Sequence, residues 1–204
     1  MHQHIIFDFD GTLVDSQEVK DKIFLDLAGS NRGLRDLISA MLSEGHMTRN
    51  ELVAEIYEKV DLTRFGASLP DVQKTVSKQL DCAVMSMSLR EHCSNILKLC
   101  QVQQRKLYVS SATPLQNLIR LLRTLGIIDA FEIISGSPRT KGQFLRELKL
   151  AKSILGNDIL VIGDREDDMI SASNHGCDFI CVGKKPILTA GVNNRSEERR
   201  VGKE

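Results

Sequence analysis

The chain has 204 residues, of which 42% are hydrophobic and 26% charged. This length suits one domain with an inserted subdomain, and the composition is that of an ordinary globular protein. Basic and acidic residues number 27 each, so no excess positive charge favours nucleic acid or an anionic membrane as a partner. No apolar run reaches the ~18 residues that span a bilayer, and we expect neither a signal peptide nor a membrane anchor. The five cysteines form no C-x-x-C pair, which favours reduced thiols in a cytoplasmic protein.

Short β-rich runs and helical patterns alternate along most of the chain. The β-rich runs occupy residues 4–10, 106–111, 131–135, 158–164 and 178–183. Helical patterns separate the last four runs, and the first of these helices is predicted to begin with Thr113 as its capping residue. Apolar strands that alternate with helices predict an α/β fold with a Rossmann-like parallel sheet covered on both faces.

The long interval between the first two strands breaks this alternation, because it contains only helical patterns. Capping-box sequences begin at Thr48 and at Ser88, which predicts a helix start at each. We therefore expect an all-helical subdomain at residues 16–87, inserted into a core formed by residues 1–15 and 88–194.

The last ten residues, RSEERRVGKE, are excluded from this fold prediction. They are charged or small and have no apolar period, and they resemble the translation of a short sequencing adapter. We expect residues 195–204 to be a disordered or non-native tail that replaces the natural C-terminus.

Polar residues follow the predicted strands at their carboxyl ends. These residues are Asp8 and Asp10 after the first strand, Ser111 after the second, Lys141 after the third, and Asp164 after the fourth. Such ends meet at one edge of a parallel sheet, where the carboxylates would repel one another. A Mg²⁺ ion relieves this repulsion, and the hydroxyl, the lysine and helix N–H groups suit a phosphoryl group. The sequence therefore predicts a magnesium and phosphate site.

Four motifs resemble those of the haloacid dehalogenase superfamily. FDFDGTLVDS resembles the first motif, in the branch of phosphoglycolate phosphatases and β-phosphoglucomutases. Ser111 in VSSATP is similar to the second motif, Lys141 in GSPRTKG to the third, and VIGDREDD to the fourth. The resemblance spans about residues 5–183, and the helical insertion resembles the C1-type cap of this family.

The resemblance implies a role for each motif residue. Asp8 would be the nucleophile that forms an aspartyl phosphate, and Asp10 the general acid and base. Mg²⁺ would be held by the Asp8 carboxylate, the Asp10 backbone carbonyl and Asp164. The phosphate-binding set would be Ser111, Lys141, Gly11, Thr12 and Ala112, with Asp168 orienting Lys141 or a metal-bound water.

Two neighbouring pairs of residues and the role of Arg165 remain open on the sequence alone. The motif intervals favour Ser111 over Ser110, and Asp168 over Asp167. Arg165 replaces the small residue that the family often has, and it either reaches the substrate or faces water.

We therefore predict a Mg²⁺-dependent phosphatase for a small phosphorylated metabolite, resembling phosphoglycolate or a sugar phosphate. One alternative is a phosphomutase of the β-phosphoglucomutase type, which shares the nucleophile and the metal. The other is a non-catalytic binding or regulatory protein with the same fold. Nucleic acid and membranes are not expected as partners, and the sequence does not indicate an oligomeric state.

Overall fold

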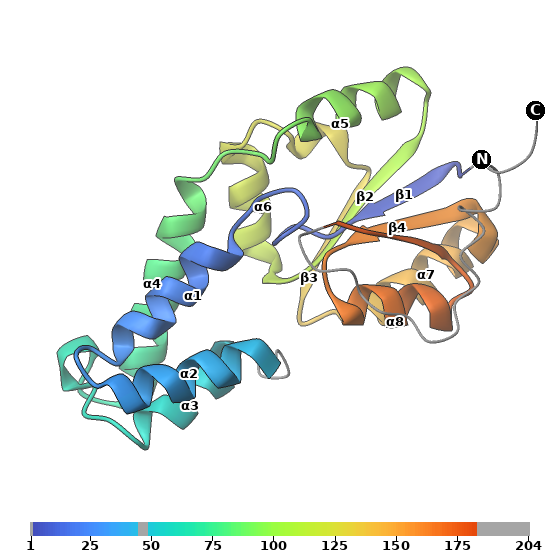
Figure 1. Ribbon diagram of the computed structural model, residues 1–204. Helices are drawn as coiled ribbons and strands as arrows, with labels where there is room; N and C mark the ends of the chain where they lie inside the picture. Colours follow the sequence, from blue (N-terminus) through green and yellow to red (C-terminus); the bar gives the residue numbers. More distant parts are fainter. Residues whose placement is uncertain (1, 45–48, 183–204) are drawn as a thin grey trace, which may run out of the picture.

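A computed structural model of the protein describes residues 2–44 and 49–182 (Figure 1). Its five strands are β1 (His4–Phe7), β2 (Lys106–Pro114), β3 (Ile133–Ser137), β4 (Ile159–Gly163) and β5 (Asp178–Cys181). They form one parallel sheet in the order β3-β2-β1-β4-β5. The chain therefore has the predicted α/β, Rossmann-like fold. β1 lies between β2 and β4, where the chain reverses its direction across the sheet, and ligands bind beside such a reversal.

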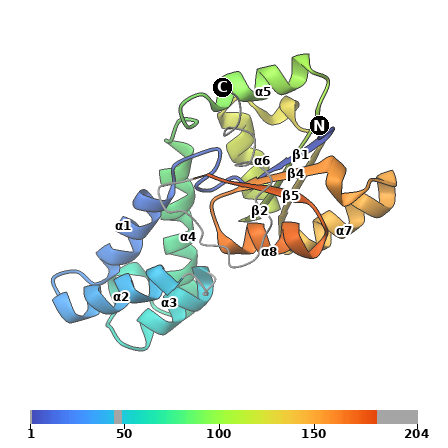
Figure 2. The same ribbon diagram turned by 45° about the vertical axis from the view of Figure 1, so that its right-hand side comes forward.

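Helices cover both faces of the sheet (Figures 1 and 2). α5 (Cys93–Val102) and α6 (Leu115–Thr124) pack on one face, and α7 (Lys141–Lys152) and α8 (Glu166–Asn174) pack on the other. Alternate residues of β1 point to opposite faces, so Ile5 and Phe7 enter the first core and Ile6 enters the second. Short 3₁₀ helices at η2 (Ile128–Ala130) and η3 (Gly156–Asp158) precede β3 and β4.

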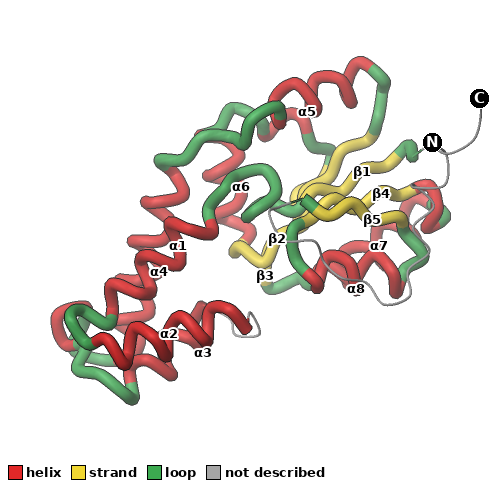
Figure 3. The backbone as a smooth tube through the Cα atoms, viewed as in Figure 1, coloured by secondary structure: helices red, strands yellow, loops and turns green. Residues whose placement is uncertain are grey.

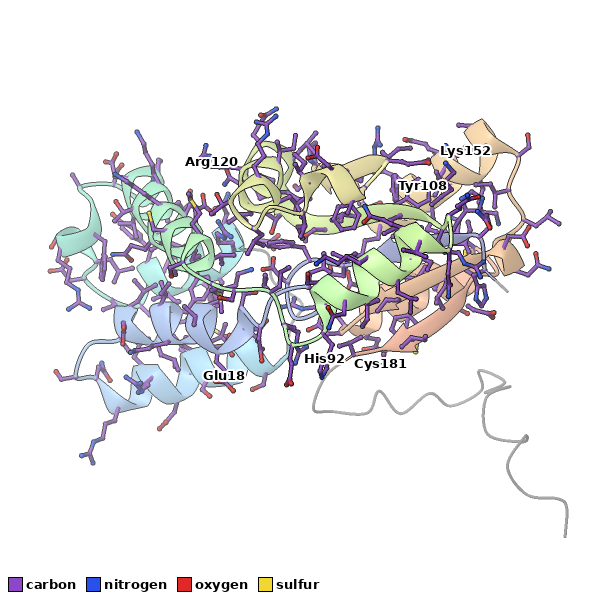
Figure 4. All side chains as sticks on the ribbon, turned by 90° about the horizontal axis from the view of Figure 1, so that it is seen from above. Glu18, His92, Tyr108, Arg120, Lys152 and Cys181 are labelled. Atoms are coloured by element: carbon purple, nitrogen blue, oxygen red, sulfur yellow. The ribbon has the colours of Figure 1, made fainter. Side chains whose placement is uncertain are left out.

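The remaining helices lie to one side of the sheet and share a core of their own (Figure 3). They are α1 (Gln17–Leu27), α2 (Arg32–Glu44), α3 (Arg49–Tyr57) and α4 (Leu69–Met85), with the 3₁₀ helix η1 (Thr63–Phe65). We call residues 17–85 the helical region. Figure 4 places Glu18 of α1 far from Tyr108 and Lys152, which mark the opposite end of the molecule.

Two helix starts differ from the sequence prediction. Pro114, not Thr113, is the N-cap of α6, because β2 continues through Thr113 to pair Pro114 with Ser137 of β3. α5 begins at Cys93, so the predicted start at Ser88 is wrong.

The cause of the second difference is a tertiary contact. Leu89 forms an isolated bridge with Val14, and the Arg90 N–H donates to the Leu13 carbonyl at 2.9 Å. Residues 88–91 are therefore used to hold the loop after β1 and do not start a helix. The predicted start at Thr48, the core residues 183–194 and the tail 195–204 lie outside the described residues. Among the described helices, each is too short or too polar to cross a bilayer.

Candidate active site

A cavity of about 380 Å³ lies between the carboxyl edge of the sheet and the helical region. Five of the predicted site residues line it: Asp8, Asp10, Ser111, Ala112 and Lys141. Side chains from α1, α2, α3 and α4 complete the wall on the opposite side. The structure thus brings motif residues that are far apart in sequence to one cavity.

Lys141 forms ion pairs with acidic residues that follow two different strands, Asp8 after β1 and Asp168 after β4. Its Nζ lies 3.3 Å from Asp8 Oδ1 and 2.5 Å from Asp168 Oδ1. The Thr140 side chain caps α7, in a capping box with Gln143, and so fixes Lys141 at the first helical position. Burial would lower the pKa of Lys141, but the charges of Asp8 and Asp168 outweigh burial and raise the pKa. Lys141 is therefore a fixed cation beside Asp8.

Three carboxylates converge beside this lysine. Asp8, Asp164 and Asp168 each offer an oxygen atom, and these atoms lie within 4.8 Å of one another. Burial raises the pKa of Asp8 well above its ordinary value; Lys141 opposes this shift, and the nearby acids add to it. Asp164 Oδ1 is buried and has no hydrogen-bond partner among the residues that the structure describes. A buried, unpartnered carboxylate oxygen within an acidic cluster fits a hard divalent cation.

The turn after β1 requires glycine at position 11. Gly11 has a φ of +81°, and a Cβ atom there would lie 2.1 Å from Asp164 Oδ2. A larger residue would therefore push the Asp164 carboxylate away from Asp8. Thr12 is buried beside this turn, and its Oγ1 has no partner within the described part of the chain.

Asp10 is held by three groups from two segments, the start of α1 and the end of β2. Its Oδ1 accepts from Ser16 Oγ at 2.6 Å and lies 2.5 Å from Lys20 Nζ, and its Oδ2 accepts from Thr113 Oγ1 at 2.8 Å. Burial alone would raise the pKa of Asp10, but the Lys20 charge and these hydrogen bonds together lower it. Asp10 is therefore an ionised, oriented carboxylate that faces the cavity.

The structure separates the paired candidates that the sequence left open. Ser111 lines the main cavity with Asp8, whereas Ser110 lines a smaller space below it. Asp168 is 1% exposed and lies closer to Lys141 than Asp167, whose side chain is 59% exposed. Arg165 donates from Nη2 to Gln17 Oε1 at 2.8 Å, so it contacts the helical region.

Sequence reasoning missed three residues that shape the site. Lys20 comes from α1, and its contact with Asp10 depends on how that helix packs against the core. Thr113 was assigned to a helix cap, yet its hydroxyl donates to Asp10. Arg90 donates from Nη1 to the Gly11 carbonyl, and its Nη2 lies 3.5 Å from Asp15 Oδ2, so it holds the turn after β1. The only sequence signal for Arg90 was its place near the end of the insertion.

Comparison with known proteins identifies relatives of this arrangement. A family model described as haloacid dehalogenase-like hydrolase matches residues 5–182. A candidate β-phosphoglucomutase from Thermotoga maritima has a similar structure, with a TM-score of 0.72 and 18% identity over 94% of this chain and 88% of that one. A candidate phosphatase from Clostridium difficile has a TM-score of 0.66 and 21% identity over 88% of this chain and 84% of that one. At these identities, the two structures show a shared fold.

Among curated proteins, the chain is similar to the tyrosine-protein kinase PtkA of Mycobacterium tuberculosis (strain H37Rv). The two are 25% identical over 187 residues, which cover 89% of this chain and 62% of PtkA. The chain thus spans less than two thirds of the curated relatives that it matches.

Proposed function

This chain belongs to the haloacid dehalogenase-like hydrolases, and on that premise we propose that it is a Mg²⁺-dependent phosphatase for a small phosphorylated metabolite. The observation that carries the proposal is the placement of Asp8. This residue is 4% exposed and lies 3.3 Å from a lysine ammonium, beside two further carboxylates. A phosphate dianion and a divalent cation are the ligands that balance such a set of charges.

The proposed reaction has two displacements at phosphorus. A carboxylate oxygen of Asp8 attacks the phosphorus atom, the bond to the ester oxygen breaks, and the departing oxygen takes a proton from Asp10. Water then attacks the aspartyl phosphate and gives a proton to Asp10, and the bond from phosphorus to the Asp8 oxygen breaks. Asp10 is ionised before substrate binds, so it must acquire its proton with or after the substrate.

The other motif residues bind and orient the phosphoryl group in this proposal. Lys141 offsets its negative charge, and the Ser111 hydroxyl and the backbone N–H groups of Thr12 and Ala112 donate hydrogen bonds to its oxygens. The Gly11 N–H already donates to the Val14 carbonyl at 2.7 Å, so Gly11 shapes the turn and does not bind the phosphoryl group. Asp168 holds Lys141 in place through the 2.5 Å contact.

The acidic cluster suits Mg²⁺ as the cofactor. Asp8, the backbone carbonyl of Asp10 and Asp164 would hold it, and the unpartnered Oδ1 of Asp164 supports this assignment. A bound Mg²⁺ would neutralise negative charge on the transferring group. Asp168 also belongs to the cluster, but its close contact with Lys141 favours a positioning role.

We further propose that residues 16–87 act as a cap over this site. α1 begins at Gln17 and α4 ends at Met85, and these helix ends support hinges near residues 15–16 and 86–88. Enclosure of this kind excludes bulk water and suits a small substrate in a cytoplasmic enzyme better than a macromolecule. Phosphoglycolate and sugar phosphates remain the substrates that the sequence resemblance favours.

Phosphate release tests the proposal. The purified protein should hydrolyse p-nitrophenyl phosphate with Mg²⁺ and lose this activity with a chelator. Asp8→Asn should abolish turnover and keep the fold, whereas Asp129→Asn, at an exposed position in η2, should retain full activity. Substantial turnover by Asp8→Asn would contradict covalent catalysis.

The same assay separates the alternatives. A phosphomutase would require a bisphosphate activator and would release little phosphate from its substrate. A folded protein that binds Mg²⁺ but releases no phosphate from any ester would instead support a non-catalytic role.

A further inference from the structure

The cavity has two chemically different walls. The core wall carries the phosphate-site groups. The helical region contributes five apolar side chains, Phe24, Met41, Leu42, Leu52 and Leu80, together with six polar ones, Gln17, Lys20, Asp21, Arg49, Asn50 and Ser77. Met41 and Leu42 of α2 are half-buried, and the other three belong to the buried core of the helical region. The far wall of the cavity is thus backed by the apolar core of α1–α4.

This apolar wall lies where the leaving group of a phosphate ester would be. Asp8 approaches phosphorus from the sheet side, and in-line displacement places the departing oxygen on the opposite side of the phosphorus atom. The carbon portion of the substrate therefore extends away from the sheet and towards α1–α4.

Most charged and amide side chains of this wall already have protein partners. Lys20 contacts Asp10 at 2.5 Å, and Arg49 donates to Asp81 at 3.2 Å. Gln17 donates to Asp21 at 2.7 Å and accepts from Arg165. A buried hydroxyl without a partner costs about 1–3 kcal/mol. A leaving group with several hydroxyls would therefore lose more hydrogen bonds to water than this wall replaces.

We propose that the preferred substrates are phosphate monoesters whose leaving group is apolar, such as a short alkyl chain or a single ring. The inference rests on the proposed phosphatase function and narrows its substrate class. It departs from the expectation of phosphoglycolate or a sugar phosphate, which the motifs alone suggested. The cavity, at about 380 Å³, is near the lower end of the range for small-molecule sites.

A homologous series of esters measures the effect. Phosphate release from methyl, ethyl, propyl and butyl phosphate is compared at saturating Mg²⁺, as kcat/KM relative to methyl phosphate. Each methylene that enters the apolar wall should raise kcat/KM about fourfold, equivalent to ~0.8 kcal/mol. Propyl and butyl phosphate should also exceed glycerol 1-phosphate and erythritol 4-phosphate, which have the same carbon counts, by about tenfold or more. The hydroxylated alcohols are the better leaving groups, so intrinsic reactivity cannot produce this preference.

Two substitutions test whether the apolar wall causes the gradient. Met41→Gln keeps the side-chain size and adds polar atoms, and Leu42→Asn does the same at the neighbouring half-buried position. Each should flatten the increase per methylene, with circular dichroism confirming the helical content. Leu150→Gln is the control, because Leu150 is 75% exposed on α7, away from the cavity, and it should leave the gradient unchanged.

The possible results distinguish this inference from the proposed function. Faster hydrolysis of the hydroxylated esters, or a flat alkyl series in the unsubstituted protein, would overturn the substrate class and leave the phosphatase standing. If kcat/KM still rises with each methylene in both Met41→Gln and Leu42→Asn, the apolar side chains of α2 are not the cause of the preference. No phosphate release from any ester by the folded protein would overturn the proposed function itself.

Discussion

Replacing Gly11 with alanine should displace Asp164 and so weaken Mg²⁺ binding at the proposed metal site. The new Cβ atom would lie 2.1 Å from Asp164 Oδ2, 2.4 Å from Cγ and 2.8 Å from Oδ1. All three carboxylate atoms are therefore closer than non-bonded atoms tolerate, and the Asp164 side chain must rotate away. In addition, residue 11 has a φ of +81°, which costs a non-glycine residue about 1–2 kcal/mol of backbone strain.

Gly126→Ala separates these two effects. Gly126 has a φ of +68°, and a Cβ atom there would meet no atom within 4 Å, so this variant carries the strain without the clash. Gly126→Ala should lower the free energy of unfolding by about 1–2 kcal/mol, and each kcal/mol lowers Tm by ~2–4 °C. Its stabilisation by Mg²⁺ should be unchanged.

Thermal or urea unfolding with and without Mg²⁺ provides the assay. At a Mg²⁺ concentration of 100 times Kd, the unsubstituted protein should gain about 2.7 kcal/mol. Gly11→Ala should gain less than ~1 kcal/mol, since it loses one carboxylate ligand, and should be about 3–4 kcal/mol less stable than the unsubstituted protein in Mg²⁺. If Gly11→Ala gained as much from Mg²⁺ as Gly126→Ala does, the inferred role of Asp164 would be wrong.

Three further predictions concern the charges of the site. Lys141→Met should abolish turnover and lower the free energy of unfolding by about 3 kcal/mol, because it leaves buried acids unpaired. In the same urea titration, the control Lys98→Met, at an exposed position, should lower it by under ~0.5 kcal/mol. Thr113→Val should lower kcat about tenfold, the loss expected for one hydrogen bond to the Asp10 carboxylate; an unchanged kcat in a steady-state assay would show that this bond is not needed. Because burial raises the pKa of Asp8, the folded metal-free protein holds a proton that the unfolded chain has lost, so its stability falls as pH rises above about 4 towards the raised pKa. Mg²⁺ replaces that proton, so the gain in Tm on adding Mg²⁺ should be larger near neutral pH than near pH ~5; a pH-independent gain measured by calorimetry would contradict this.

The sequence predicted which residues meet at the carboxyl edge of the sheet, because the motif residues directly follow the strand ends. β1 ends at Phe7, so Asp8 lies just beyond the sheet wherever the helices pack. The helix after β3 begins at Lys141, as the helical pattern that starts at this residue predicted. These positions depend on local structure and on the parallel sheet, and both are encoded in apolar periodicity.

The residues that surround Asp10 were not predictable in this way. Lys20 reaches it only because the start of α1 lies beside the turn after β1, a tertiary arrangement that the sequence pattern does not specify. The local signals at Thr113 and Ser88 were genuine capping patterns, but strand pairing with β3 and the bridge from Leu89 to Val14 overrode them. Local propensity gives way where tertiary hydrogen bonds compete for the same backbone.

The most direct test of the account is to identify the residue that carries the phosphoryl group. Borohydride reduces an aspartyl phosphate to homoserine, so protein quenched during turnover with Mg²⁺ can be reduced, digested and analysed by mass spectrometry. Covalent catalysis by Asp8 predicts homoserine at position 8, and none in Asp8→Asn. Homoserine at Asp10 or Asp164, or unmodified Asp8 in protein quenched during active turnover, would contradict it.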